Sequence, residues 1–163
     1  MNAERKVTLY EADLYEKEDV KEESVQFIIF RVAAEWYGVE IAKVKEVVRM
    51  GKISFLPSAP AHIAGIVHSR GNIMSVTDLK SIFGLHGEEP GRKSRLVVVS
   101  SGAMETCLLV DEVAEPAEVA MSKIDPELTT VDPEKAGFIE GEFKISDKLV
   151  GILKVEKILE KSW

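Results

Sequence analysis

The sequence is poor in the residues on which metal centres and many active sites depend. Among its 163 residues there is one cysteine, Cys107, so no internal disulfide can form. There are three histidines, and none has a carboxylate or cysteine at the spacing of a zinc site. A CxxC pair, an HExxH motif and a glycine-rich phosphate loop are also missing. The sequence therefore predicts no metal site and no cofactor.

Clustered positive charge and long apolar runs are absent as well. The net charge is −7, and no basic run is longer than Arg92-Lys93. Binding to a phosphate backbone needs clustered Lys and Arg, so a nucleic-acid partner is not expected. No stretch approaches the 18 or so apolar residues of a membrane span, and the N-terminus has no apolar signal core. These features predict a cytoplasmic protein that does not insert into a membrane.

Two weak arrangements leave an enzyme as the alternative from another class. Cys107 begins an apolar run over residues 107–110, where a thiol is expected to be buried and inert. His68 and Ser69 resemble half of a nucleophilic dyad, but neighbours on a strand project to opposite faces and cannot share a proton. We therefore predict that the protein is not an enzyme, with a small thiol or serine hydrolase as the alternative.

What is present is a charged N-terminal segment followed by a β-rich chain. Residues 1–24 hold eight acidic and four basic residues, too few apolar side chains for a core of their own. Val7, Tyr10 and Leu14 have helical spacing, so both disorder and a short helix remain open. The folded part is predicted to span residues 25–161, mainly as strands with short helices at 79–83 and 156–161.

The centre of the pattern is a predicted hairpin between residues 63 and 79. Arg70-Gly71-Asn72 forms its turn, and Gly71 with Asn72 is expected to supply the positive φ that a tight hairpin needs. Thr77-Asp78 is a candidate N-cap for the helix that follows, and Gly84 is expected to end that helix in the left-handed conformation.

The two halves of the folded part resemble each other. Val44-Lys45-Glu46-Val47 aligns with Val110-Asp111-Glu112-Val113 at an offset of 66 (112 − 46), and later segments align at 76 (139 − 63; 149 − 73). The added residues between the two registers are assigned to an inserted loop at 125–133. The repeat predicts two small β-barrels in tandem, from residues 25–85 and 94–161, with a linker at 86–93. Closure of each half alone and exchange of strands between halves both fit this pattern.

We predict that such a chain acts by contact with another protein. Arg70 lies at the hairpin tip, where its guanidinium is suited to clamp a partner's carboxylates. A solvated turn residue and an internal pair with a residue such as Glu46 are the alternatives. Val44 and Glu46 are two residues apart, so one face of an extended segment is expected to carry both an apolar anchor and a carboxylate.

Six segments follow one another along the chain: YGVEIAKVKEV (37–47), LPSAPAHIAG (56–65), Arg70-Gly71, VTDL (76–79), VDEV (110–113) and GIL (151–153). In this order they resemble the CheW family of chemotaxis coupling proteins, and the likeness covers about residues 25–159.

The resemblance implies a pair of SH3-like five-stranded β-barrels that acts as a non-catalytic adaptor. Its expected partners are the cytoplasmic tips of methyl-accepting chemoreceptors and the regulatory domain of a CheA-type histidine kinase, within cytoplasmic receptor arrays. The motif positions Val44, Glu46, Arg70 and Gly71 are expected to contact the receptor. No kinase-contact residue can be assigned, although the loop at 125–133 is the expected region.

This chain departs from the family pattern at two places, and one of them is the first turn, Ala33-Ala34-Glu35, which lacks the glycine or asparagine often found there. The family's Asn-Leu-Arg-Gly is here His68-Ser69-Arg70-Gly71, which predicts an altered receptor contact. A coupling module that serves a non-chemotactic pathway, such as motility or development, is the alternative function with the same fold.

Overall fold

The computed structural model describes residues 22–127 and 132–162. The predicted N-terminal extension therefore lies outside the described residues except for its last three positions, and so do residues 128–131 of the predicted insertion. In the described part the chain is mostly β, as predicted, with few and short helices. In chain order the strands are β1 (Ser24–Val32), β2 (Glu35–Glu40), β3 (Val44–Arg49), β4 (Ile63–Ser69), β5 (Asn72–Asp78), β6 (Arg95–Ser101), β7 (Met104–Val110), β8 (Glu112–Val113), β9 (Ala117–Ala120), β10 (Ile139–Ile145) and β11 (Lys148–Leu153). The helices are α2 (Leu79–Phe83), α3 (Pro133–Ala136) and α4 (Val155–Ser162), and the short 3-10 turns are η1 (Ile41–Lys43) and η2 (Met121–Lys123).

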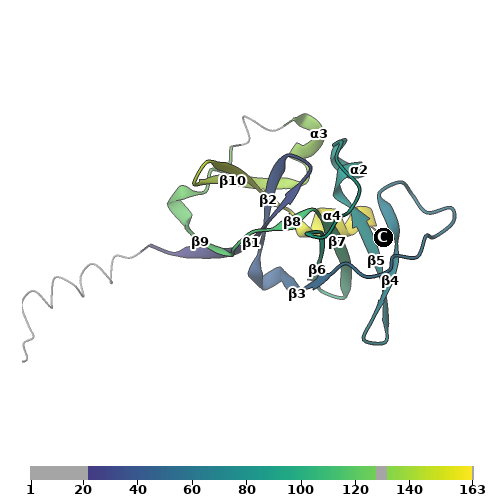
Figure 1. The fold of residues 1–163 in the computed structure, drawn as a ribbon. Coiled ribbons are helices and arrows are strands. Elements are labelled where there is room, and N and C mark those ends of the chain that lie inside the picture. Colours follow the sequence, from purple (N-terminus) through teal and green to yellow (C-terminus); the bar gives the residue numbers. More distant parts are fainter. Residues whose placement is uncertain (1–21, 128–131, 163) are drawn as a thin grey trace, which may run out of the picture.

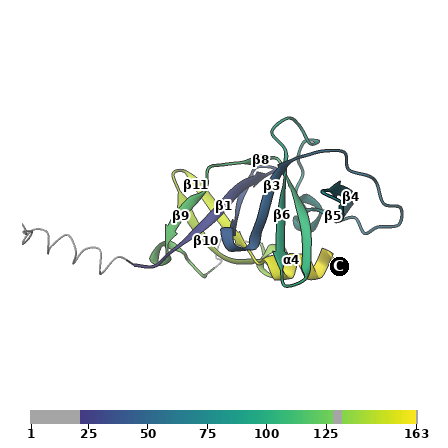
Figure 2. The same cartoon turned by 90° about the horizontal axis from the view of Figure 1, so that it is seen from below.

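Two sheets with the same strand pattern make up the molecule. Sheet A has the order β10-β11-β2-β1, with β8 and β9 both paired to the other edge of β1. Sheet B has the order β4-β5-β7-β6-β3. The two groups of strands lie side by side in both views (Figure 1, Figure 2). Each sheet contains strands from both halves of the sequence, so the strands are exchanged between the halves.

Sheet A has six strands where five were expected, because one strand is divided in two. Residues 114–116 separate β8 from β9, and the last of them is Pro116. Proline has no backbone N–H to donate and interrupts a regular ladder. Together β8 and β9 occupy the position that β3 holds in sheet B.

Each sheet curls until a single bridge joins its two edges. In sheet B the chain beyond β3 returns so that Ser54 pairs with Ile66 of β4, through N–H···O bonds of 2.8 and 2.9 Å. In sheet A the chain beyond η2 pairs Asp125 with Glu142 of β10, with the same two lengths. These bridges close the two sheets into barrels.

A glycine lies beside each closing bridge and leaves room for it. A Cβ atom on Gly65 would lie 2.3 Å from the carbonyl oxygen of Ser54, and one on Gly141 would lie 3.3 Å from that of Asp125. Both glycines also follow a β-bulge at the start of their strand. The sequence repeat matches these glycines at an offset of 76 (141 − 65), and the close approach of backbone explains why neither position carries a side chain.

The pairing of the strands corrects the predicted offset of 66 residues between the two halves. Gly38 of β2 pairs in parallel with Ile152 of β11, and Cys107 of β7 pairs in parallel with Val76 of β5. Ile152 and Val76 are equivalent at the offset of 76 (152 − 76), so Gly38 and Cys107 are equivalent at 69 (107 − 38). The predicted offset of 66 is therefore wrong by three residues, because it aligned similar letters rather than paired positions.

Alternating side chains divide the core into three clusters. In β1, Phe27 and Ile29 point into sheet A, whereas Phe30 and Val32 point into a core shared by both sheets. The interior of sheet B is formed by Val67, Met74, Val76, Leu96, Val98 and Cys107. The shared core also holds residues from β6, β7, α2 and α4, so the two barrels are joined by apolar packing.

The described residues include no helix that is both long enough and apolar enough to cross a membrane.

Candidate functional site

The predicted contact residues lie on sheet B, around the tip of the β4–β5 hairpin. Arg70 and Gly71 form its two-residue turn, with φ angles of 50° and 81°. Two successive positive φ angles are the hallmark of the hairpin turn that matches the twist of the strands. The prediction that Gly71 and Asn72 supply these angles is wrong, because Asn72 already pairs with Ser69 as the first residue of β5.

The helix after this hairpin begins and ends as predicted. The Asp78 side chain accepts a hydrogen bond of 3.0 Å from the N–H of Lys80, which caps the N-terminus of α2. Gly84 ends the helix with a φ of 64°, in the left-handed region. The hairpin is thus held at its base by a capped helix, while its tip projects.

Arg70 reaches from this tip towards β3 and contacts a carboxylate there. One guanidinium nitrogen (Nη2) lies 3.5 Å from Oε1 of Glu46, so the internal pair weighed from the sequence is present. The Arg70 side chain is nevertheless 80% exposed, against 28% for Glu46. An exposed ion pair of this length contributes little to stability, and the guanidinium keeps most of its donors open to solvent.

Val44 and Glu46 do not share a face of β3, contrary to the prediction. The register of β3 against β6 shifts between the two residues: Val44 pairs with Val99 and Glu46 with Val98. Directly opposed residues of antiparallel strands project to the same side. Val44 accordingly packs on the core between the sheets, whereas Glu46 faces the inner side of sheet B, towards Cys107.

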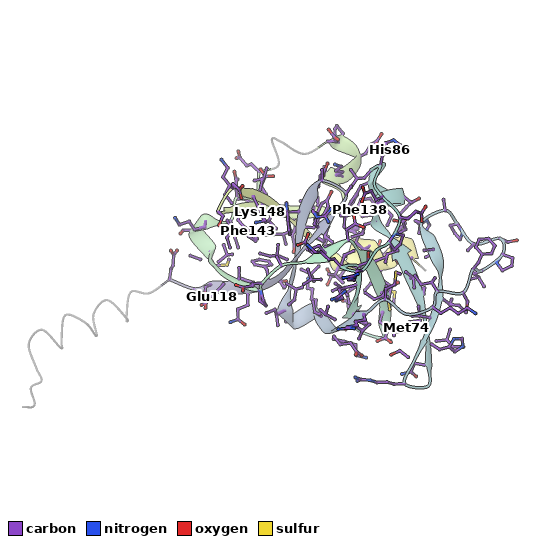
Figure 3. The ribbon with its side chains drawn as sticks, in the orientation of Figure 1. Met74, His86, Glu118, Phe138, Phe143 and Lys148 are labelled. Atoms are coloured by element: carbon purple, nitrogen blue, oxygen red, sulfur yellow. The ribbon has the colours of Figure 1, made fainter. Side chains whose placement is uncertain are left out.

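Exposed apolar side chains, which were not predicted as contact residues, also occur on β5 and in the segment that precedes β4. Phe55 is 80% exposed, and Ile73, three residues beyond Arg70, is 63% exposed. Leu56 and Ile73 line a cavity of about 670 Å³ between the 56–63 segment, β5 and the end of α4. A run of two large apolar residues just before Pro57 is the signal that was available in the sequence. Figure 3 shows Met74, the neighbour of Ile73, on the sheet B side of the molecule.

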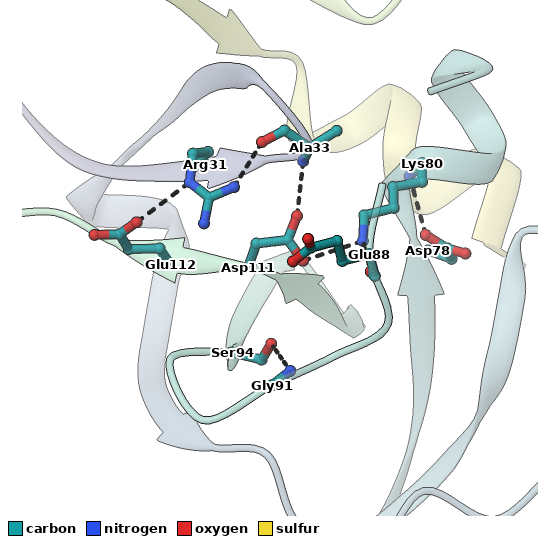
Figure 4. A network of polar contacts seen from close by, with 9 residues as sticks. All are labelled: Arg31, Ala33, Asp78, Lys80, Glu88, Gly91, Ser94, Asp111 and Glu112. Carbon is teal, nitrogen blue, oxygen red and sulfur yellow. Dashed lines mark hydrogen bonds and ion pairs between the residues drawn. The ribbon is translucent and has the colours of Figure 1, made fainter. Parts of the chain in front are cut away.

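A polar network fixes the segment that carries the repeated VDEV motif. The Asp111 carboxylate accepts from the N–H of Ala33 at 2.7 Å and pairs with the Lys80 ammonium at 3.1 Å (Figure 4). Arg31 donates to Glu112 at 3.2 Å and to the Ala33 carbonyl at 2.7 Å. These bonds tie the β1–β2 turn, the end of β7 and α2 together. The role of this motif in the structure is thus to join the two sheets.

No catalytic group is prepared for chemistry in the described part of the chain. Cys107 is buried, and its burial together with the charges of Glu105 and Glu46 raises the thiol pKa to about 11, so it is protonated at neutral pH. His68 and Ser69 are adjacent in β4, whose register places them on opposite faces. No group of three His, Cys, Asp or Glu side chains among the described residues is placed to hold a metal ion.

The described residues thus form two fused, closed β-barrels with an exposed charged hairpin tip, an architecture suited to contact with another protein. Comparison with known proteins agrees with this interpretation. The CheW-like domain model matches residues 26–162, most of the chain. The chain therefore belongs to the CheW family of non-catalytic chemotaxis scaffold proteins.

Individual relatives support the same assignment. The chain is similar to the chemotaxis protein CheW of Helicobacter pylori, with 30% identity over 94% of this chain and 92% of the relative. It is also similar to Protein FrzA of Myxococcus xanthus, with 30% identity over 62% of this chain and 63% of that protein. The crystal structure of the scaffolding protein TtCheW from Thermoanaerobacter tengcongensis matches with a TM-score of 0.75 and 33% identity, over 83% of this chain and 88% of that one.

Proposed function

We propose that this chain couples the cytoplasmic tips of methyl-accepting chemoreceptors to the regulatory domain of a CheA-type histidine kinase. In this proposal it works in the cytoplasm as part of receptor arrays and transforms no molecule. Membership of the CheW family supports the adaptor role, and the hairpin tip supports the receptor contact.

The observation that supports the receptor contact is the backbone conformation of Arg70 together with the exposure of its side chain. Its backbone is fixed by a tight turn, and its guanidinium is 80% exposed beside a partly buried carboxylate. A guanidinium presented in this way can form two parallel bonds to a carboxylate on a partner helix. Glu46 then orients the Arg70 side chain before the partner arrives, which reduces the entropy lost on binding.

Val44 and Gly71 have different parts in this proposal. Val44 packs on the shared core and sets the position of β3, so it supports the site from below rather than presenting an apolar anchor. Gly71 lies in open space, with no atom within 4 Å of where a Cβ would be, and its positive φ keeps Arg70 at the tip. The exposed Phe55 and Ile73 extend the surface that a second partner, the kinase regulatory domain, is proposed to cover.

The proposal is tested by reversing one charge. Arg70→Glu should weaken binding to a purified receptor-tip fragment by about tenfold, because it replaces an attraction by a repulsion at a contact point. Thermal unfolding should stay unchanged, since the side chain is exposed. Arg92→Glu, with the same charge change on the 86–93 segment, is the matched control and should bind like the unmodified chain. Equal binding by both variants, or an equal loss in both, would refute the receptor contact of Arg70.

A charge swap separates contact with a partner from a purely internal role. Combining Arg70→Glu with Glu46→Arg restores the opposite charges at the hairpin tip but inverts their order. If Arg70 contacts the receptor, the double variant should remain weak in the same titration. Recovery of full affinity would show that Arg70 acts only through Glu46. Co-sedimentation with receptor tips and a CheA-type kinase, each alone and then together, tests the coupling itself.

A further inference from the structure

A second cavity, on sheet A, has no part in the function proposed above. It has a volume of about 570 Å³ and lies between β2, α3 and the β10–β11 hairpin. Its lining combines the indole of Trp36 with several charged side chains, among them Asp132, Lys135, Asp147 and Lys148. Lys148 is labelled in Figure 3, on the sheet A side of the molecule.

One of the two ammonium groups in this cavity is fully engaged by a carboxylate. Both oxygens of Glu35 accept from the Lys135 ammonium, at 2.7 and 2.9 Å, and Oε1 of Glu35 also accepts from the Tyr37 hydroxyl at 2.8 Å. Lys135 is itself buried, at 8% exposure. This triad is satisfied internally and forms a fixed wall of the cavity, with no net charge to offer a ligand.

The carboxylates of Asp132 and Asp147 remain as acceptors. Neither forms a side-chain hydrogen bond or ion pair with another described residue, and both residues are exposed at the rim. They belong to different elements, Asp132 to the start of α3 and Asp147 to the β10–β11 turn. A cation that enters between them therefore meets acceptors from two elements.

The aromatic face in the cavity already carries a cation of the chain itself. The Lys148 ammonium lies 4.9 Å from the centroid of the Trp36 ring, within cation–π distance. An ammonium group is a point charge, whereas a guanidinium is planar and can stack on an indole while its edge donates to carboxylates. The combination of one indole face and two open carboxylates thus matches a guanidinium better than an ammonium.

We propose that this cavity binds the guanidinium group of an arginine on a partner polypeptide, stacked on Trp36 and hydrogen-bonded to Asp132 and Asp147. Lys148 is the internal competitor for the same ring. This inference concerns sheet A alone and does not depend on the receptor contact at Arg70, so either can fail without the other.

The test uses N-acetyl-arginine methylamide as a probe, with the Trp36 indole N–H followed by NMR in the full chain. The arginine probe should give a saturable shift, and the citrulline analogue, which has the same shape without the charge, should give none. The double variant Asp132→Asn/Asp147→Asn should weaken binding by about fivefold, because two charged acceptors become neutral. Glu160→Gln on α4 is the matched control and should leave binding unchanged.

A gain of affinity provides the sharper result. Lys148→Met removes the competing ammonium, so the arginine probe should bind about threefold more tightly. If the double variant fails to fold, Asp147→Asn alone, at an exposed turn position, replaces it with a smaller expected loss. The absence of a saturable shift, an equal shift with citrulline, or weaker binding by Lys148→Met would each overturn the proposal.

Discussion

Equivalent places on the two sheets carry cavities of opposite character. Ala34 of the sheet A cavity and Ala103 of the sheet B cavity are related by the offset of 69 (103 − 34), and Leu149 and Ile73 by the offset of 76 (149 − 73). Around these shared positions sheet A presents an indole and charged groups, whereas sheet B presents mainly apolar side chains and prolines. The two barrels thus have the same strand order but different surfaces. The strand order determines where a cavity lies, and the side chains determine which ligand it can bind.

The difference arises partly from the inserted segment. In sheet A the chain between the closing bridge and β10 is longer and includes α3, whose Lys135 reaches Glu35 at the start of β2. In sheet B the corresponding connection contains Pro57 and Pro60 and ends directly in β4. The longer connection therefore adds a charged side chain to the wall of the sheet A cavity, whereas the shorter connection adds none to the sheet B cavity.

The largest effect on stability is expected when the glycines beside the two closing bridges are replaced by alanine. Gly65→Ala should lower the free energy of unfolding by about 3 kcal/mol, because the new Cβ would lie 2.3 Å from the Ser54 carbonyl oxygen and force the bridge apart. Gly141→Ala, its equivalent in sheet A, should cost about 1 kcal/mol, since the nearest atom is 3.3 Å away and can shift. Denaturant unfolding measures both. Equal losses would contradict the unequal tightness of the two bridges.

A smaller effect is expected from breaking the charged wall of sheet A. Lys135→Met should lower the free energy of unfolding by about 1 kcal/mol, because Glu35 loses its ion pair while remaining partly hydrated. Lys144→Met, an exposed substitution on β10, is the control and should change stability little.

The same variant should also change how stability depends on pH. Burial would raise the pKa of Glu35, but the hydrogen bonds from Lys135 and Tyr37 lower it below the ordinary value of 4.5. A lowered folded pKa contributes stability above the unfolded pKa, and this contribution is lost as the pH falls through the folded value. The stability difference between the unmodified chain and Lys135→Met should therefore shrink below about pH 4.5. A difference that stays constant down to pH 3 would argue against the pair.

The smallest expected effect concerns the two hairpin tips. Arg70 and Ser146 are equivalent at the offset of 76 (146 − 70), and each has a positive φ, of 50° and 55°. Arg70→Asn should raise the free energy of unfolding by about 0.5 kcal/mol, because asparagine tolerates the left-handed region better than arginine does. Thermal unfolding measures the gain. A loss of stability would show that the Arg70–Glu46 pair outweighs the strain of the turn.

The sequence predicted the repeat and the hairpins because both leave local signals. The cap at Asp78 and the left-handed Gly84 are visible in the sequence, and both have the predicted structural role. Gly65 and Gly141 are matched by the repeat, but their place beside the closing bridges was not predicted. Exchange of strands between the halves depends on pairings between distant segments. The alternation of apolar and polar residues along a strand does not specify which strand it pairs with. The sequence alone therefore fits both closure of each half and exchange of strands between the halves.

The candidate site was predicted less well, and the reason is one extra residue in β3. The shift in register between Val44 and Glu46 sends their side chains to opposite faces, although a regular strand would place them together. The sequence of residues 44–46 contains no residue pattern that indicates a β-bulge. The sheet A cavity was missed because Trp36, Asp132 and Lys148 are far apart in sequence and are brought together only by the closed fold.

The exchange of strands has a consequence for synthesis on the ribosome. When β3, β4 and β5 have emerged, the two strands that fill the middle of their sheet, β6 and β7, are still to be made. All five strands of sheet B have been made once β7 ends at Val110, whereas β1 and β2 of sheet A still wait for the hairpin of β10 and β11 and expose bare strand edges until then. During synthesis the sheet B barrel can therefore close before the sheet A barrel, whose first strands must wait for pairing partners that are distant in sequence.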